Sequence, residues 1–144
     1  MVSKISHSEF ISIFSKVPRI CVDLVIQTKE GTFLTKRAID PWKGEWHLPG
    51  GSILFGETIE NAVKRVAREE LNLEVEPIKI LGVIEFLSKL SLKRHSISLV
   101  FLIKIKSGEI KLNEQATEFI FTKIAPKNTI EEHKKFLVEK FSYK

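Results

Sequence analysis

The sequence has only one cysteine, one methionine and one tyrosine among its 144 residues. A lone cysteine, Cys21, cannot form a disulfide within the chain, so the fold must depend on its core, as is usual in a reducing cytosol. No stretch approaches the run of about 20 apolar residues that a membrane helix requires, and the first ten residues lack the apolar segment of a signal peptide. These absences argue against a disulfide scaffold and a membrane protein, and we expect a cytoplasmic protein.

Charge of one sign is not strongly dominant either. The chain carries 23 Lys and Arg against 18 Asp and Glu, for a net charge of +5. Because the lysines are scattered and no basic cluster is interleaved with aromatics, nucleic acid is not expected as a partner. The length predicts one domain, 1–144. We expect a small-molecule substrate and no membrane partner, and a homodimer is left open.

One stretch, Leu48 to Leu73, carries most of the chemical signal. It reads LPGGSILFGETIENAVKRVAREELNL. The glycines Gly50 and Gly51 after Pro49 indicate a tight turn that can present a main-chain carbonyl to a cation. We predict that a helix follows over about 58–71, with Thr58 as its start signal.

The predicted helix has an apolar stripe and a charged face. Its apolar residues recur at helical spacing: Ile59, Ala62, Val63, Val66 and Ala67. Arg65 and Glu69 are four residues apart and therefore share a face. The adjacent carboxylates Glu69 and Glu70 would repel each other unless a cation neutralised them, which favours Mg²⁺, with Mn²⁺ as an alternative. The competing interpretation is the solvated face of an ordinary surface helix.

The order Gly51, Glu57, Arg65, Glu69, Glu70 resembles the signature of the Nudix hydrolases, which cleave nucleoside diphosphates linked to another moiety. In that pattern Gly51 and Glu57 are structural. The sequence departs from it twice: Val66 stands where a glutamate is usual, and Asn72 where a glycine is usual. Asn tolerates the left-handed conformation that ends such a helix. The resemblance implies an α/β fold, an α/β/α sandwich with a mixed β-sheet between helices.

The remaining pattern agrees with that layered fold. A short helix is predicted over 6–15, with Ser6 and Glu9 as a capping box, and a terminal helix over 130–141, with Thr129 and Glu132 as another. Strands are predicted over 20–27, 32–36, 78–87, 96–105, 110–112 and 119–121. Residues 38–46 and 88–94 are predicted loops.

Beyond the signature, the segments VPRICVDLVI, GTFLTKR, PWKGEWHLPGG and NEQATEF make the chain most similar to one branch, the GDP-mannose mannosyl hydrolases. This resemblance implies that Asp23 and Arg37 assist a displacement at the anomeric carbon of the sugar. It also implies a metal held by the Gly50 carbonyl, Glu70 and Gln115.

Two positions leave the attacked atom open between carbon and phosphorus. Ala116 stands where that branch has the histidine that serves as general base. His95 and Glu114 are the alternative candidates for the base. Glu69 is present, as in the phosphorus-attacking relatives, where it would join the metal ligands or position water.

Other side chains have predicted roles around the substrate. Arg37 and Lys36 would bind phosphate oxygens, and Arg65 would orient the carboxylates by pairing with Glu57 or Glu69. Trp42 and Trp46 would stack on a base or sugar or, as the alternative, roof the core.

Three functions follow from this interpretation. The leading one is Mg²⁺-dependent hydrolysis of a nucleoside diphosphate sugar such as GDP-mannose. The second is a pyrophosphatase for ADP-ribose or a nucleoside triphosphate that attacks phosphorus. The third is a catalytically silent domain that senses a nucleotide or binds RNA.

Overall fold

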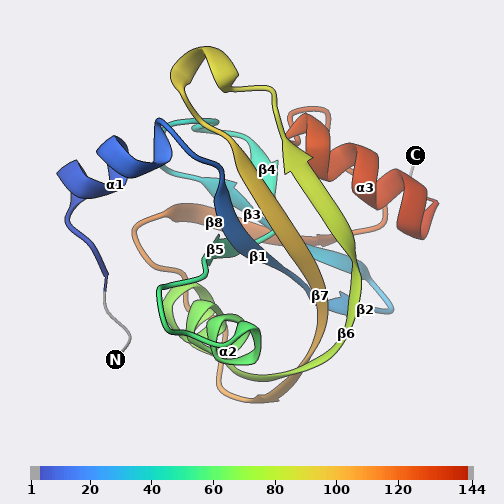
Figure 1. Ribbon diagram of the computed structural model, residues 1–144. Helices are drawn as coiled ribbons and strands as arrows, with labels where there is room; N and C mark the ends of the chain where they lie inside the picture. Colours follow the sequence, from blue (N-terminus) through green and yellow to red (C-terminus); the bar gives the residue numbers. More distant parts are fainter. Residues whose placement is uncertain (1–3, 143–144) are drawn as a thin grey trace.

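The computed structural model describes residues 4–142 and shows two β-sheets lying between helices (Figure 1). The elements in chain order are α1 (His7–Phe14), β1 (Arg19–Val25), β2 (Gln27–Thr28), β3 (Gly31–Arg37), β4 (Trp46–His47), β5 (Gly50–Ser52), α2 (Ile59–Leu71), β6 (Glu74–Phe86), a 3₁₀ turn η1 (Leu90–Leu92), β7 (Ser96–Ser107), β8 (Ala116–Thr122) and α3 (Glu131–Phe141).

The first sheet is mixed and has the strand order β5-β1-β7-β6. Strands β1 and β7 are parallel, whereas β5 pairs with β1 and β6 with β7 in the antiparallel sense. The second sheet has the order β2-β3-β4, and β8 pairs with β3. The predicted α/β architecture with a mixed sheet is therefore confirmed.

Two apolar clusters hold the helices against the sheets. One joins Val63, Val66 and Ala67 of α2 to Val22 and Leu24 of β1. The other places Phe136 and Leu137 of α3 against Val25, Leu34 and Val100. The predicted stripe of α2 is buried except for Ile59, which is 44% exposed because it lies in the first turn, outside the contact with the sheet.

The ends of α1 and α2 follow the local signals. Thr58 Oγ1 accepts the Asn61 N–H at 3.1 Å at the start of α2, and Asn72 ends this helix in the left-handed conformation with φ of 60°. Ser6 and Glu9 form the predicted capping box of α1. Within residues 4–142 no helix has the length and apolar character needed to span a membrane.

Three local predictions were wrong. Residues 110–112 form no strand; Ile110 and Leu112 pack on the α2 cluster from an extended loop instead. The capping box of α3 is absent because Glu132 accepts hydrogen bonds from the backbone and hydroxyl of Ser88. Strand β6 begins at Glu74 rather than at residue 78, because pairing with β7 extends it.

Candidate functional site

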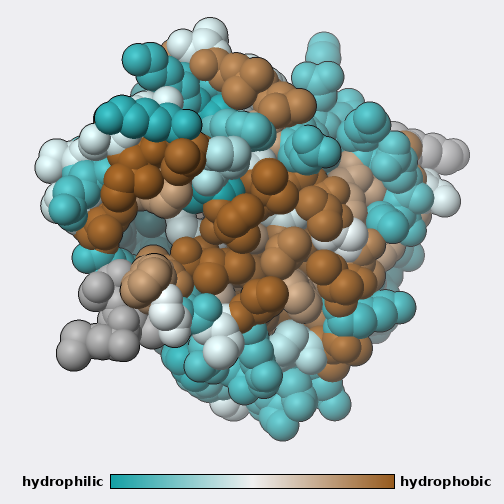
Figure 2. All heavy atoms as spheres, viewed as in Figure 1, coloured by the Kyte–Doolittle hydropathy of each residue, from teal (hydrophilic) through white to brown (hydrophobic). Residues whose placement is uncertain are grey.

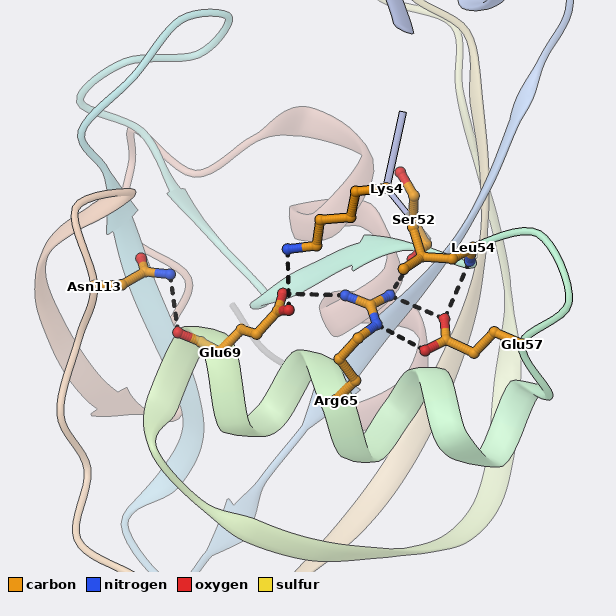
Figure 3. Close-up of polar contacts among 7 residues, drawn as sticks. All are labelled: Lys4, Ser52, Leu54, Glu57, Arg65, Glu69 and Asn113. Carbon is orange, nitrogen blue, oxygen red and sulfur yellow. Dashed lines mark hydrogen bonds and ion pairs between the residues drawn. The ribbon is translucent and has the colours of Figure 1, made fainter. Parts of the chain in front are cut away.

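Arg65 joins α2 to the loop that precedes it (Figure 3). Its Nε lies 2.7 Å from Glu57 Oε2 and its Nη2 3.0 Å from Glu57 Oε1. Nη2 also donates to the Ser52 carbonyl at 2.6 Å, and Nη1 lies 3.1 Å from Glu69 Oε2. The predicted pairing of Arg65 with these carboxylates is therefore confirmed, and it involves both of them.

Glu57 has a structural place in this arrangement. Its side chain is 4% exposed, and its Oε1 accepts the Leu54 N–H at 3.1 Å. Burial alone would raise the pKa of Glu57, but the hydrogen bonds from Arg65 and Leu54 outweigh it and lower this pKa. Glu57 therefore stays ionised and closes the loop onto the helix.

Gly51 and Val66 fit together beneath the loop. A Cβ on Gly51 would lie 3.2 Å from Val66 Cγ2, which is tight contact. Val66 is 1% exposed, so its side chain fills the core under the turn. The helix thus offers two carboxylates, Glu69 and Glu70, at the end of this face instead of three.

Glu70 is half-buried, and its environment disfavours a bare carboxylate. Burial first, and then the neighbouring charge of Glu69, raise the pKa of Glu70 to about 7. The exposed Lys4 ammonium lies 3.0 Å from Glu69 Oε1, above the same end of the helix (Figure 3). A cation bound here would offset repulsion that is now relieved by a proton and a lysine.

The predicted cation ligands suit a hard cation that keeps part of its water shell. No three His, Cys, Asp or Glu side chains converge on a cation site anywhere in residues 4–142. The predicted set is instead mixed, with carboxylates from Glu69 and Glu70, the Gly50 carbonyl and the Gln115 amide. Oxygen donors in such small number fit Mg²⁺, which commonly retains several waters and completes its shell with phosphate oxygens.

The segment 113–116 lies at the C-terminal end of α2. Asn113 Nδ2 donates to the backbone carbonyl of Glu69 at 2.9 Å, and the Gln115 N–H donates to Asn113 Oδ1 at 2.9 Å. Gln115 is exposed, and Ala116 lies opposite Arg37 in the β3–β8 pair. The fold therefore brings the segment that contains Gln115 to the carboxylate end of α2.

Arg37 supplies positive charge on the other side of this region. Its Nε donates to the Pro41 carbonyl at 2.7 Å. Burial and the nearby Arg19 lower the pKa of Arg37, whereas Glu70 acts in the opposite direction. Because an arginine pKa remains far above neutral, the guanidinium is charged, and it lies near enough to Glu70 for the two charges to interact. Lys36, one residue earlier, holds its Nζ 5.7 Å from the centre of the Trp46 ring.

A cavity of about 370 Å³ opens beside Arg37, and two loops line it. Its lining residues are Asp40, Pro41, Trp42, Lys89, Leu92 and Arg94. Trp42 thus stands at a cavity, whereas Trp46 is 7% exposed and belongs to the core under α3. Lys89 and Arg94 come from the 88–94 loop and add two positive charges to this lining.

His95 is half-buried and Asp23 is buried. The backbone carbonyl of His95 accepts the Arg19 N–H at 2.9 Å. Asp23 is 6% exposed, and its Oδ2 lies 2.8 Å from His133 Nε2 on α3. No local pattern indicates this partner, because it is 110 residues away along the chain.

Comparison with known proteins agrees with this geometry. A family model of the NUDIX domain matches residues 17–139. The chain is 31% identical over 121 residues to the low-salt glycan biosynthesis protein Agl8 of Haloferax volcanii, covering 81% of this chain and 78% of that protein. It is 36% identical over 104 residues to the ADP-ribose pyrophosphatase of Methanocaldococcus jannaschii, covering 72% of this chain and 61% of that protein. The crystal structure of a MutT NUDIX hydrolase from Burkholderia pseudomallei superposes with a TM-score of 0.78 at 26% identity, over 86% of this chain and 98% of that one.

Without divalent cations, the protein should lose stability as the pH rises. The pKa of Glu70 is raised from 4.5 to about 7 in the folded state, so its stabilising contribution is complete below the lower value and is lost as the pH rises through the higher one. Between pH 5 and pH 8 in EDTA, the Tm of the wild type should fall by about 3 °C or more beyond the fall in Glu70→Gln. Thermal scans that give the same pH dependence for both proteins would contradict this assignment.

Proposed function

Because the chain belongs to the Nudix hydrolase family, we propose that it is a Mg²⁺-dependent hydrolase that cleaves the diphosphate of a nucleoside diphosphate sugar in the cytoplasm. The observation that carries this proposal is the position of Glu70, which interacts electrostatically with both Glu69 and Arg37. Carboxylates for a cation and a guanidinium for phosphate oxygens thus stand at one place.

Each side chain then has a task on the diphosphate. Glu70, Glu69, the Gly50 carbonyl and Gln115 would hold Mg²⁺, which when bound would neutralise charge on the diphosphate and stabilise the phosphate that leaves. Arg37, with Lys36 beside it, binds phosphate oxygens. Arg65 keeps Glu69 oriented from the helix, at 3.1 Å, and need not touch the substrate.

Attack at phosphorus suits the surroundings of Asp23 and Glu69 better than attack at carbon. Asp23 is buried and bonded to His133, which leaves little of its carboxylate for a developing sugar cation. Ala116 provides no general base. The side chain of Glu69 is 40% exposed, so it can position and deprotonate a water molecule. Displacement at the sugar carbon of GDP-mannose, assisted by Asp23 with His95 or Glu114 as base, is the second candidate.

The cavity beside Trp42 would receive the part of the substrate beyond the diphosphate. Its volume of about 370 Å³ lies within the usual range for small-molecule pockets. Trp42 can stack on a base or sugar, and Lys89 and Arg94 add positive charge to its walls. The relatives whose names refer to ADP-ribose and to glycan biosynthesis support a nucleotide joined to a sugar as the substrate class.

Product analysis separates these candidates. We expect hydrolysis of ADP-ribose or GDP-mannose with Mg²⁺ to yield a nucleoside monophosphate, and ¹⁸O from labelled water to enter a phosphate. Glu70→Gln should lower kcat/KM by at least 100-fold, whereas Glu60→Gln, in an exposed ion pair with Lys64 on the same helix, should leave it unchanged.

Two results would contradict the proposal in different ways. A nucleoside diphosphate product with ¹⁸O in the sugar would establish attack at carbon. No turnover of any nucleotide sugar, ADP-ribose or nucleoside triphosphate would instead favour a silent sensing or RNA-binding domain.

We also propose that the protein pairs with a second copy of itself through an apolar surface made by α1 and the β6–β7 side of the first sheet. Figure 2 shows apolar side chains gathered over β6 and β7. In the sheet register Val83 pairs with Leu99 and Ile80 with Phe101. This is the face that α2 covers over β1 and over the start of β6, but not at Val83 and Ile80. Val83 is 54% and Ile80 51% exposed.

Helix α1 lacks cover in the same way. None of its residues is buried, and Ile11 and Ile13 are 40% and 43% exposed. An eight-residue helix is too short to be stable without tertiary packing. A twofold arrangement that packs α1 of each copy on the open sheet of the other would cover both surfaces twice and approach the ~800 Å² per partner of standard interfaces. A membrane surface is a poorer fit, because α1 contains no lysine or arginine.

Light scattering coupled to size exclusion tests this pairing. The wild type should elute as a dimer at micromolar concentrations, and Val83→Glu should convert it to a monomer by placing a charge in the interface. Ile124→Glu is the matched control: Ile124 is 60% exposed but lies after β8, so this variant should remain dimeric. A monomeric wild type at all concentrations, or binding of the wild type to lipid vesicles through Val83, would contradict the proposal.

A further inference from the structure

Leu48 lies just before the signature glycines, and two histidine side chains form hydrogen bonds with its backbone. His47 Nδ1 lies 2.7 Å from the Leu48 carbonyl, and His133 Nδ1 lies 3.3 Å from the Leu48 N–H. The two rings stack with centroids 6.1 Å apart and planes at 19°. Both the backbone N–H and the carbonyl of Leu48 are therefore satisfied by side chains rather than by a strand partner.

The hydrogen bonds fix the tautomer of each ring. A carbonyl can only accept, so His47 Nδ1 carries a proton and its Nε2 accepts from the Thr35 hydroxyl at 3.2 Å. An N–H can only donate, so His133 Nδ1 is bare and its Nε2 donates to Asp23 Oδ2 at 2.8 Å. His133, from α3, thus connects the loop to a carboxylate on β1.

Asp23 in turn lies against Gly50, two residues after Leu48. It pairs with Gly50 between β1 and β5, and a Cβ on Gly50 would overlap Asp23 Oδ1. One residue further, the Leu24 N–H donates to the Pro49 carbonyl at 2.8 Å. Consecutive loop residues 48–50 are therefore each fixed by a buried group beneath them.

We propose that His133 and Asp23 form a positioning pair that sets the direction of the Gly50 carbonyl and so tunes the affinity of the site for its divalent cation. This inference rests on the proposed function, because it takes the Gly50 carbonyl as a cation ligand. Neither His133 nor Asp23 touches the cation or the substrate. They act through the loop, as outer hydrogen-bond partners do when they orient the atoms that bind a metal.

Core packing alone does not explain why Asp23 and His133 occupy these buried positions. Asp23 and His133 are 6% and 3% exposed, and apolar residues of similar volume in such a place are commonly as stabilising as a buried ionic pair. Apolar residues could not form the directional hydrogen bonds that His133 makes to the Leu48 N–H and to Asp23. Both ends of this pair terminate on the loop, at the Leu48 N–H and at Gly50, within the segment that must be placed accurately to bind a cation.

Metal binding by His133 variants tests the proposal. His133→Leu removes both hydrogen bonds, and we expect the dissociation constant for Mn²⁺, measured by electron paramagnetic resonance without substrate, to rise at least tenfold. His133→Asn keeps an acceptor for the Leu48 N–H but not the donor to Asp23, so it should recover only part of the affinity. Phe136→Leu, which shortens another buried side chain of α3, is the control. It should lower the Tm but change the Mn²⁺ dissociation constant by less than twofold.

Amide hydrogen exchange at Leu48 provides a readout that does not depend on metal. Protection there should fall in His133→Leu and return in His133→Asn. Unchanged Mn²⁺ affinity in His133→Leu, or an equal loss in Phe136→Leu, would overturn the positioning role while leaving the proposed function intact. If His133→Leu does not fold, Asp23→Asn is the second variant. Unchanged Mn²⁺ affinity and unchanged protection of the Leu48 amide in Asp23→Asn would then overturn the positioning role. A wild type that binds no Mn²⁺ would overturn both the inference and the proposed function.

Discussion

The forked ion pair between Arg65 and Glu57 is the interaction on which the site depends. Glu57 lies in the loop and Arg65 two turns into α2, and their side chains are only 4% and 19% exposed. Loss of one partner would leave the other charge buried, at a cost of about 3–5 kcal/mol. Because the same guanidinium also binds the Ser52 carbonyl and Glu69, it sets the loop and the helix carboxylates in one frame.

Beside this ion pair, further charged side chains of both signs are partly shielded from water. Glu69 and Glu70 lie near the end of α2, and the charge of Arg37 interacts with that of Glu70. The Nε of Arg37 donates a hydrogen bond to the Pro41 carbonyl. In such surroundings, charged groups interact more strongly than they would in water. Core residues limit the composition of the site, since Val66 occupies the space under Gly51 where a further carboxylate would be buried.

The parts of the structure that depend on neighbours in sequence could be predicted. Thr58 and Asn72 bound α2 as expected because helix caps are made within one turn. The pairing of Arg65 with Glu69 follows from helical spacing alone. The short strands β4 and β5 were not predicted, because two or three residues carry no periodic pattern.

Contacts between distant segments could not be derived in the same way. Glu132 has the spacing of a capping residue, but Ser88 from another loop takes its carboxylate. His133 drew no attention in the sequence, because its meaning comes from Asp23 and Leu48, which only the tertiary fold brings to it. For Trp42 and Trp46 the sequence left stacking and core roles open, and burial separates the two residues.

In the function proposed here, the turn at Gly50 and the end of α2 together bind a divalent cation. Anomalous diffraction from crystals soaked in Mn²⁺ locates such a cation. We expect a single strong peak within coordination distance, about 2.2 Å, of both a Glu70 carboxylate oxygen and the Gly50 carbonyl oxygen. A peak at any other place, with Glu70 and Gly50 unoccupied, would contradict this proposal.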